Sequence, residues 1–328
     1  MPIKNLLLAL AVFVALLAAC GDDEADTDAE QPTSEAPADA SDAGAGDEAA
    51  DGAGGGFPVT IESAAGSFTL EARPERIVSL SPTATEMLFA IGAGDQVVAA
   101  DEFSTYPPEA PVTDLSGFDP NVEAVLGFEP DLVVIANDAN DLVAGLTAAG
   151  VPVLVSAAPV DIESGYPLIA DLGVAVGRVD ETADVIATMR DEMAAAFAAA
   201  PDAEVRIYHE LDDTYFSASS FGFIGSIYAE LGATNIADAG DPDRTGFPQL
   251  TEEAIVEADP EIIVITDEIG YTAADVAARP GWGDITAVVD DAIVSVDADI
   301  ASRWGPRLPQ FVTAVADAMA AAAAVPAG

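Results

Sequence analysis

The chain has 328 residues, of which 58 are acidic and 10 basic, so its formal net charge at pH 7 is −48. An excess of negative charge on this scale excludes nucleic acid and anionic lipid as electrostatic partners. One cysteine and one histidine provide neither a disulfide framework nor a ligand set for a bare zinc or manganese ion. The carboxylates are spread over the whole chain, which is typical of a solvated surface rather than of one acidic site.

The amino terminus has the pattern of a secretory signal. Residues 1–20 carry one positive charge at Lys4, an apolar run over Leu6–Leu17 and small residues before Cys20. The apolar run is too short to remain in a membrane as a helix. Leu17-Ala-Ala-Cys20 resembles the lipobox of bacterial lipoproteins, in which the cysteine sulfur receives a lipid after cleavage. We therefore expect a lipid anchor on Cys20; the alternative is an ordinary signal peptide with a chance cysteine.

Residues 21–56 are expected to form a disordered acidic tether. The segment has no aromatic and no branched aliphatic residue. It therefore cannot bury enough apolar surface to offset the chain entropy that folding would cost. With a lipid on Cys20, this tether would hold a mobile domain at the outer face of the cytoplasmic membrane.

The first lobe is expected over residues 57–176. It opens with a strand pair over Val59–Leu70, in which Gly66-Ser67 predicts the hairpin turn. A core strand follows at Arg76–Leu80, and Pro82 suits the first turn of the next helix. The remaining elements alternate in type: strands at Val97–Ala100, Leu132–Ile135 and Val151–Val155, and a helix at Asp141–Ala149.

A long helix is expected over residues 177–201. Asp180 is its expected N-cap, and Pro201 ends the run. A helix of this length reaches about 30 Å and can cross a small domain. Apolar residues recur along it at helical spacing: Val185, Ile186, Met189, Met193 and Phe197.

The second lobe is expected over residues 202–328 and repeats the pattern of the first. Its predicted elements are strands at Val205–Glu210, Ile262–Thr266 and Ile293–Val296, helices at Ile224–Leu231 and Thr251–Ala258, and a closing alanine-rich helix. The two lobes also match residue by residue. Glu123–Ile135 reads almost in register with Glu253–Ile265, and Arg76-Ile-Val matches Arg206-Ile-Tyr.

Internal duplication explains this match, with chance recurrence of a common α/β pattern as the alternative. The predicted fold class is α/β, with two similar Rossmann-like α/β lobes joined by one long helix. Two lobes connected in this way leave a cleft between them, where ligands usually bind.

Aromatic and arginine side chains in the loops that follow strands point to a binding site. These loops are favoured ligand positions in open α/β sheets, and exposed aromatic residues there carry more information than aromatic residues of the core. Aromatic walls with a few arginines suit a large, partly planar ligand that is anionic or rich in amides. The candidate ligand-binding residues are Tyr106, Phe118, Tyr215, Phe216, Arg244, Phe247, Arg303, Trp304 and Arg307.

The sequence offers little for enzyme chemistry. The only histidine, His209, ends a predicted core strand, where a structural role is favoured over that of a catalytic base. The predicted folded part contains neither cysteine nor lysine, and no nucleophile motif or phosphate-binding loop is present. We predict no catalytic residue, no metal site and no cofactor apart from the ligand itself.

Glu123 and Glu253 occupy the same place in the two repeats, near the start of a short helix. A matched pair of carboxylates, one in each lobe, suits a two-fold partner with two basic sockets. The alternative is two independent, solvated surface residues.

Several motifs resemble those of one family of transport proteins. They are Arg76–Glu86, Tyr106-Pro-Pro108, Asn121–Val134 and Ser302–Arg307. From about Pro74 to Met319, the chain is similar to substrate-binding proteins of ABC importers, in the group with a long helical backbone that handles ferric siderophores and cobalamin. The resemblance implies a monomer that captures a metal chelate and delivers it to a permease dimer with its ATPase subunits.

The same resemblance assigns roles to particular residues. It implies that Glu123 and Glu253 dock into arginine pockets on the two permease subunits. Cobalamin binders of the family place aromatic residues at positions that match Tyr106, Phe118, Phe247 and Tyr215–Phe216. The alternatives are a haem-binding member of the same family, an enzyme on the same scaffold such as a tetrapyrrole metal chelatase, and a surface adhesion protein.

Overall fold

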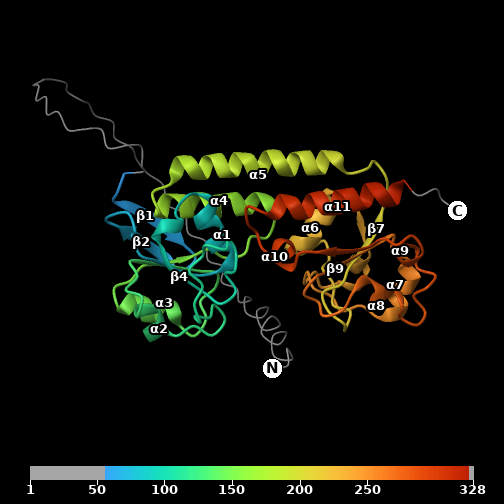
Figure 1. Cartoon of the computed structure of the whole chain (residues 1–328), viewed down its shortest axis with the longest axis horizontal. Helices are drawn as coiled ribbons and strands as arrows, with labels where there is room; N and C mark the ends of the chain where they lie inside the picture. The colour runs from blue at the N-terminus through green and yellow to red at the C-terminus, as the bar shows by residue number, and fades with distance from the viewer. Residues whose placement is uncertain (1–55, 325–328) are drawn as a thin grey trace, which may run out of the picture. The chain divides into compact units, whose positions relative to one another are not determined.

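The computed structural model describes residues 56–324 (Figure 1). The expected signal peptide, the lipidation site at Cys20 and all but the last residue of the expected tether lie outside these residues. The described residues 56–324 lie within one compact unit. No helix in the described part combines the length and the apolar character needed to cross a bilayer.

The first lobe contains a four-stranded parallel sheet with the order β4-β3-β5-β6. The strands are β3 (Ile77–Leu80), β4 (Val97–Ala100), β5 (Leu132–Ile135) and β6 (Val153–Val155). Their side chains are almost all buried, as expected for a parallel sheet that is covered on both faces. Its helices are α1 (Pro82–Ala90), η1 (Gly94–Gln96), α2 (Val122–Leu126), α3 (Leu142–Ala148) and α4 (Ile162–Ala175).

The hairpin before this sheet differs in detail from the prediction. Strands β1 (Val59–Ser63) and β2 (Gly66–Leu70) pair antiparallel, with Ser63 opposite Gly66. The turn is therefore Ala64-Ala65, and the predicted turn residues Gly66 and Ser67 begin the second strand. Gly66 has a φ of +107°, so it still provides the backbone conformation that residues with side chains avoid.

The second lobe repeats the topology of the first. Its parallel sheet has the order β10-β9-β7-β8. In both sheets the second strand along the chain lies outside the first, and the third and fourth follow on the other side. The elements are β7 (Arg206–His209), α6 (Phe223–Glu230), β8 (Thr234–Asn235), η2 (Ile236–Gly240), α7 (Glu252–Ala258), β9 (Ile262–Thr266), α8 (Ala273–Ala277), α9 (Thr286–Val289), β10 (Ile293–Val296), α10 (Ala298–Ser302) and α11 (Leu308–Ala323).

Hydrogen bonds at equivalent positions support the internal duplication. The Arg76 Nε donates to the Glu129 carbonyl oxygen at 3.0 Å, and the Arg206 Nε donates to that of Asp259 at 2.8 Å. Both accepting residues have a positive φ, 50° and 47°. Such agreement in an uncommon backbone conformation follows from a shared ancestor more readily than from chance.

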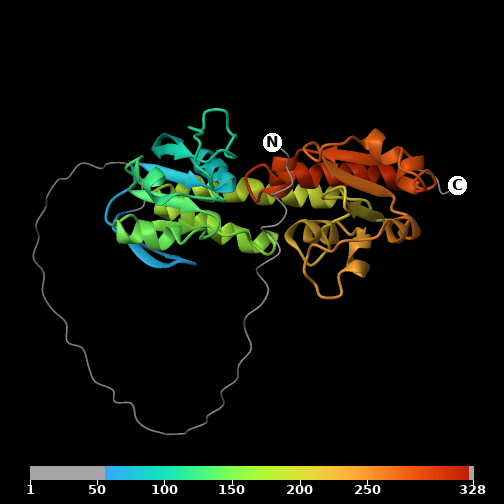
Figure 2. The same cartoon turned by 90° about the horizontal axis from the view of Figure 1, so that it is seen from below.

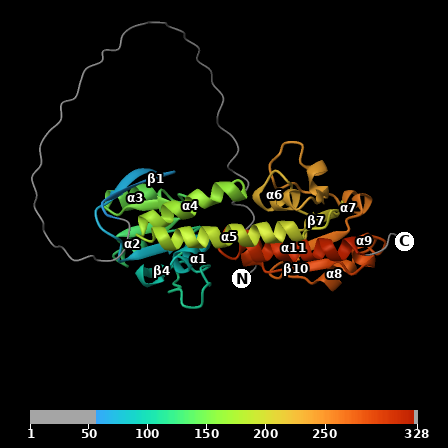
Figure 3. The ribbon, with the colours of Figure 1, turned by 90° about the horizontal axis from the view of Figure 1, so that it is seen from above.

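Helix α5 (Val179–Ala199) connects the lobes and has 21 residues, about 30 Å of helix. It packs along α4 of the first lobe and α11 of the second, side by side in two views (Figures 1 and 3). Met189 and Met193 of the predicted stripe are buried against this layer. The helix begins directly after Arg178, so Asp180 lies in its first turn rather than at the expected cap.

One hydrophobic core continues from the first lobe through α5 and α11 into the second lobe. Two smaller clusters lie on the opposite faces of the two sheets, one within each lobe. Figure 2 shows the lobes, blue to green and orange to red, with α5 connecting them. The lobes are therefore joined along the α5 side and have separate cores on the other side.

Candidate functional site

Exposed aromatic side chains collect at the carboxyl ends of both parallel sheets. Within residues 56–324, the exposed large aromatic residues are Phe103, Tyr106, Phe118, Phe216, Phe221 and Phe247, three from each lobe. Phe103, Tyr106 and Phe118 lie between β4 and α2, and Phe216 and Phe221 lie between β7 and α6. Phe247 lies in the loop that connects η2, which follows β8, to α7. In open α/β sheets, ligands bind at this edge.

The wall of the first lobe is made by Phe103 and Phe118. Their rings meet edge to face with centroids 5.5 Å apart, and Phe118 remains 63% exposed. The Phe103 backbone N–H donates to Asp101 Oδ1 at 2.8 Å. Asp101 is buried, and this burial raises the pKa of its carboxyl group. The buried carboxyl thus fixes the start of the loop that presents Phe103.

Two buried aspartates hold the loops of the second lobe. Asp212 Oδ1 accepts hydrogen bonds from the backbone N–H and the hydroxyl of Thr214, at 2.8 and 2.6 Å. Asp241 Oδ2 accepts from the Gly246 N–H at 2.8 Å and from the Ser219 hydroxyl at 2.6 Å. Burial alone would raise the pKa of Asp241, but these hydrogen bonds and those from Thr245 hold it below its ordinary value.

The loops that carry Phe221 and Phe247 approach each other backbone to backbone. The Ser219 N–H donates to the Gly246 carbonyl oxygen at 3.0 Å. A Cβ atom on Gly222 would lie 3.2 Å from the Gly246 Cα, and Gly246 itself has a φ of +86°. Glycine at both positions permits this approach, which brings the two phenylalanine loops of the second lobe together.

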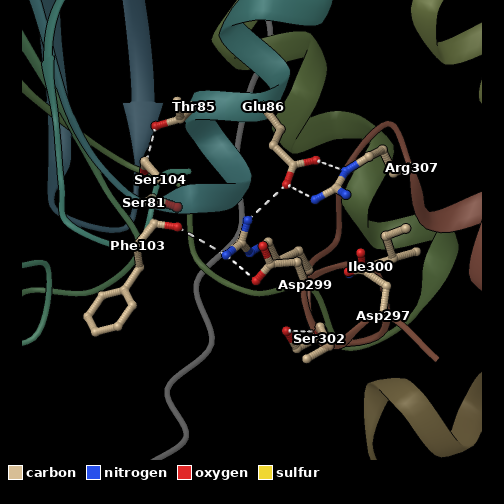
Figure 4. Close-up of polar contacts among 12 residues, drawn as sticks. Ser81, Thr85, Glu86, Phe103, Ser104, Asp297, Asp299, Ile300, Ser302 and Arg307 are labelled. Carbon is tan, nitrogen blue, oxygen red and sulfur yellow. Dashed lines mark hydrogen bonds and ion pairs between the residues drawn. The ribbon is translucent and has the colours of Figure 1, made fainter. Parts of the chain in front are cut away.

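Glu86 of α1 is a buried acid that pairs with two arginines next to the first wall (Figure 4). It is 2% exposed and accepts from Arg303 Nη1 at 3.0 Å and from Arg307 Nε and Nη2 at 2.9 and 2.6 Å. Arg303 also pairs with Asp299 and donates to the Phe103 carbonyl oxygen at 3.0 Å. The hydrogen bond with Glu86 raises the pKa of Arg307, which stays fully charged.

The structure places the predicted binding residues in two different environments. Phe118, Phe216 and Phe247 lie on the exposed walls. Arg244 is exposed beside them, and its guanidinium lies 4.1 Å from the centroid of the Phe221 ring. Tyr215, Trp304, Arg303, Arg307 and Tyr106 have other surroundings.

The indole of Trp304 is 6% exposed and packs edge to face against Tyr166, with centroids 5.4 Å apart. A Cβ atom on Gly165 would overlap this indole, so the helix carrying Gly165 is shaped to receive it. Tyr215 is half-buried and stacks on Trp282. Both side chains thus pack in the interior rather than on the walls. The sequence did not reveal this, because a loop pattern alone does not distinguish a side chain that faces a ligand from one that folds back onto the core.

Tyr106 lies beside a groove on the α5 side rather than next to Phe118. The groove has a volume of about 590 Å³ and is lined by Tyr106, Arg307 and α5 residues such as Val185 and Met189. The Arg307 guanidinium lies 4.1 Å from the Tyr106 ring centroid. Two of the three predicted ligand arginines, Arg303 and Arg307, pair with Glu86, whose burial requires cationic partners.

Sequence reasoning missed Phe103, Phe221 and Glu86. Phe103 and Phe221 lie in the same loops as Tyr106 and Phe216, so the loops themselves were the available signal. Glu86 stands in a helix whose other members are mostly apolar, and this contrast was its signal.

Glu123 and Glu253 have matching local structures. Asn121 caps α2 by accepting from the Ala124 N–H at 2.9 Å, and Thr251 caps α7 by accepting from the Ala254 N–H at 3.2 Å. Each glutamate is the second residue of its helix and is exposed. The helix N-termini favour the negative charges there.

His209 is buried in the core of the second lobe. Its Nδ1 lies 2.5 Å from the Tyr228 hydroxyl oxygen. Burial lowers the pKa of His209 to about 4, so the ring is neutral at pH 7. The described part of the chain holds no group of three His, Cys, Asp or Glu side chains arranged to bind a metal ion.

Comparisons with known proteins agree with this architecture. The family model described as periplasmic binding protein matches residues 77–300. A cobalamin-binding protein of Halobacterium salinarum is 36% identical over 275 residues, which cover 80% of this chain and 74% of that protein. An uncharacterized ABC transporter substrate-binding lipoprotein, YvrC of Bacillus subtilis, is 32% identical over 80% of this chain and 86% of that protein.

A solved structure has the same fold. The periplasmic heme-binding protein RhuT from Roseiflexus sp. RS-1, in its apo form, superposes with a TM-score of 0.67 and 28% identity. The superposition covers 76% of this chain and 99% of RhuT. Proteins of this family bind solutes for import and are not enzymes. The predicted family, the two-lobed α/β fold and the absence of catalysis are confirmed: the chain belongs to the periplasmic binding protein family.

Proposed function

We propose that this protein captures a corrinoid of the cobalamin type for an ABC importer. The observation that carries the proposal is the set of exposed aromatic side chains in the loops at the carboxyl ends of the two sheets, Phe103 and Phe118 in the first lobe and Phe216, Phe221 and Phe247 in the second. Aromatic side chains offer large, rigid contact surfaces at a low cost in conformational entropy. A wide ligand with an apolar face and amide groups matches such walls.

The charges around the walls support a corrinoid over a polyanionic ferric chelate. Arg303 and Arg307, which would attract carboxylates, both pair with the buried Glu86. Among the described residues, Arg244 is the arginine that lies exposed beside an aromatic wall. The 36% identity to a cobalamin-binding protein supports the same choice.

Haem is the second candidate ligand. The superposition on the heme-binding protein RhuT favours it, as does the exposed phenol of Tyr106, a side chain that can ligate iron. The aromatic walls suit both tetrapyrroles. A ferric siderophore remains a third outcome of a binding test.

Delivery of the ligand to the permease and attachment to the membrane would depend on residues outside the aromatic walls. Glu123 and Glu253 would dock into basic pockets of a two-fold permease dimer, which its ATPase subunits drive. Cys20 would carry the lipid that keeps the exported monomer at the outer face of the cytoplasmic membrane, and a relative named as a lipoprotein supports this part. Comparing the binding of cyanocobalamin, haem and a ferric siderophore by the purified protein tests the proposed ligand.

A further inference from the structure

A closed set of charges joins the two halves of the chain beside the ligand walls. Glu86 comes from α1 of the first lobe, whereas Arg303, Arg307 and Asp299 come from the segment over α10 and the start of α11. Each of the four side chains pairs with one or more of opposite charge, and the net charge of the two carboxylates and two guanidinium groups is zero. The Glu86 side chain is almost completely buried and those of Arg303 and Arg307 are 12% and 13% exposed, so these pairs are screened less than ion pairs in open solvent.

Both arginines of this set also hold the loop that presents the first aromatic wall. Arg303 Nη2 donates to the carbonyl oxygen of Phe103 at 3.0 Å, and the Arg307 guanidinium stacks on the ring of Tyr106. Each arginine can pair with Glu86 and contact the loop at the same time, because a planar guanidinium group donates hydrogen bonds in several directions. The stretch from Phe103 to Tyr106 is therefore held in part by two side chains that Glu86 itself fixes.

The loop has little support from its own backbone. In the described part of the chain, the backbone N–H groups of Thr105, Tyr106 and Glu109 make no hydrogen bond, and Pro107 and Pro108 have none to offer. The preceding residues are anchored to the sheet, since Asp101 N–H donates to the Ser79 carbonyl oxygen at 3.0 Å. Beyond Ser104, the Ala110 N–H donates to the Pro107 carbonyl oxygen at 2.9 Å, and the loop otherwise depends on side-chain contacts, which include those of Arg303 and Arg307.

We propose that Glu86 is a positioning residue of the ligand site, which holds Arg303 and Arg307 so that they keep the Phe103 loop in its binding geometry. This role rests on the proposed function, because Phe103 must be part of the ligand wall for it to matter to transport. Glu86 does not contact the ligand. It sets the fraction of molecules whose first wall is already in place.

The charge set has a second consequence for the site. Without Glu86, two guanidinium groups would lie next to each other with one carboxylate, Asp299, left to pair with them. Such an uncompensated pair repels and rearranges. The Phe103 carbonyl oxygen would then lose its donor, and Tyr106 would lose its stacked partner.

Amide hydrogen exchange in the ligand-free full chain, purified in detergent, tests this role directly. In Glu86→Gln we expect exchange of the Phe103 and Ser104 amides, which donate to Asp101 at 2.8 and 3.1 Å, to rise about tenfold, the change expected for loss of one charge-assisted hydrogen bond nearby. The matched control is Glu210→Gln, because Glu210 is a fully buried carboxylate that pairs with Arg279 in the second lobe. It should leave exchange of the Phe103 and Ser104 amides at the wild-type rate.

Arg303→Lys provides a second variant in case Glu86→Gln folds poorly. Lysine keeps the positive charge near Glu86 and Asp299 but cannot reach the Phe103 carbonyl oxygen with a second, fixed N–H. We expect faster exchange of the Phe103 and Ser104 amides here too. Unchanged exchange in both variants, or an equal rise in Glu210→Gln, would overturn the assignment.

Stopped-flow binding of cyanocobalamin supplies the functional readout. A positioning role lowers the fraction of competent molecules, so Glu86→Gln should slow association about tenfold and leave the dissociation rate near that of the wild type. A change confined to dissociation would contradict the role. If the wild type does not bind cyanocobalamin, the proposed ligand is wrong, and the exchange comparison still decides the role of Glu86.

Discussion

Glu123 and Glu253 stand at the same position of two equivalent helices, each two residues after a capping side chain, Asn121 or Thr251. Both are exposed, and neither helix is part of the aromatic walls. A partner with two-fold symmetry can therefore read the pair without touching the ligand.

Reversing both charges, with Glu123→Arg and Glu253→Arg, should abolish ligand uptake by cells and leave ligand affinity unchanged. Each change also removes a favourable interaction with a helix N-terminus, about 0.3–1 kcal/mol of the free energy of unfolding. The control is the double reversal of two exposed glutamates elsewhere, Glu71 and Glu192, which has the same effect on net charge. Normal uptake by the first double variant, or lost affinity, would contradict the docking role.

Truncating Phe118 or Phe247 to alanine should weaken ligand binding by about tenfold each, because an aromatic ring at the centre of an interface contributes about 1–2 kcal/mol. The free energy of unfolding should change by less than about 0.5 kcal/mol, since both rings are exposed in the ligand-free protein. Val289→Ala is the matched control, because Val289 is exposed on α9, before a strand rather than after one. Wild-type affinity in both phenylalanine variants would exclude these residues from the site.

The lobes and the long helix could be predicted because their signals are local and strong. The match of Glu123–Ile135 with Glu253–Ile265 reveals two copies of one supersecondary unit. The apolar residues at helical spacing, which include Met189 and Met193, indicate the buried face of α5. The predicted cap of α5 and the predicted hairpin turn each lie two residues from their observed positions. Element ends depend on side-chain hydrogen bonds and strand register, which a propensity pattern does not determine.

Gly225→Ala should destabilise the second lobe. A Cβ atom at this position would lie 1.9 Å from the Ser219 carbonyl oxygen, a backbone atom that cannot rotate away. We expect a loss of about 1–3 kcal/mol in the free energy of unfolding, measured by urea titration, and a displacement of the loop that carries Phe221. Gly283→Ala is the control, because nothing lies within 4 Å of a Cβ atom there. Equal stability of the two variants would contradict the close approach.

The stability of the protein should depend on pH through His209. Burial lowers the pKa of His209 from an ordinary value of 6.5 to about 4, so the unfolded chain binds a proton that the folded chain refuses. The contribution of the neutral ring is complete above pH 6.5 and falls as the pH drops from 6.5 to about 4, by about 3 kcal/mol in total.

The many carboxylates also titrate in part of this pH range and change the unfolding free energy. The contribution of His209 is therefore isolated by comparing the wild type with a variant that lacks this histidine. His209→Gln retains a polar side chain that can bond to Tyr228 but does not titrate there. The difference in unfolding free energy between the wild type and this variant should shrink as the pH falls below 6.5. A difference that is constant between pH 7 and pH 4 would show that His209 is protonated in the folded state.

The site was harder to predict than the fold, because loop side chains after strands have two destinations. Phe118 and Phe247 are exposed, whereas Trp304 turns into the core and packs on Tyr166. Arginines pose the same problem. Arg303 and Arg307 were expected to attract the ligand, but their partner, Glu86, lies more than two hundred residues away in the chain, and only the tertiary structure brings these groups together.

The central claim is that the aromatic walls select a corrinoid. Calorimetric titration of the purified full chain with cyanocobalamin, haem and a ferric siderophore tests it most directly, with the Phe118→Ala variant as the control for the site. We predict saturable one-to-one binding of cyanocobalamin that weakens in Phe118→Ala, and weaker binding of the other two. Tight binding of haem or of the ferric siderophore, with no response to cyanocobalamin, would contradict the account.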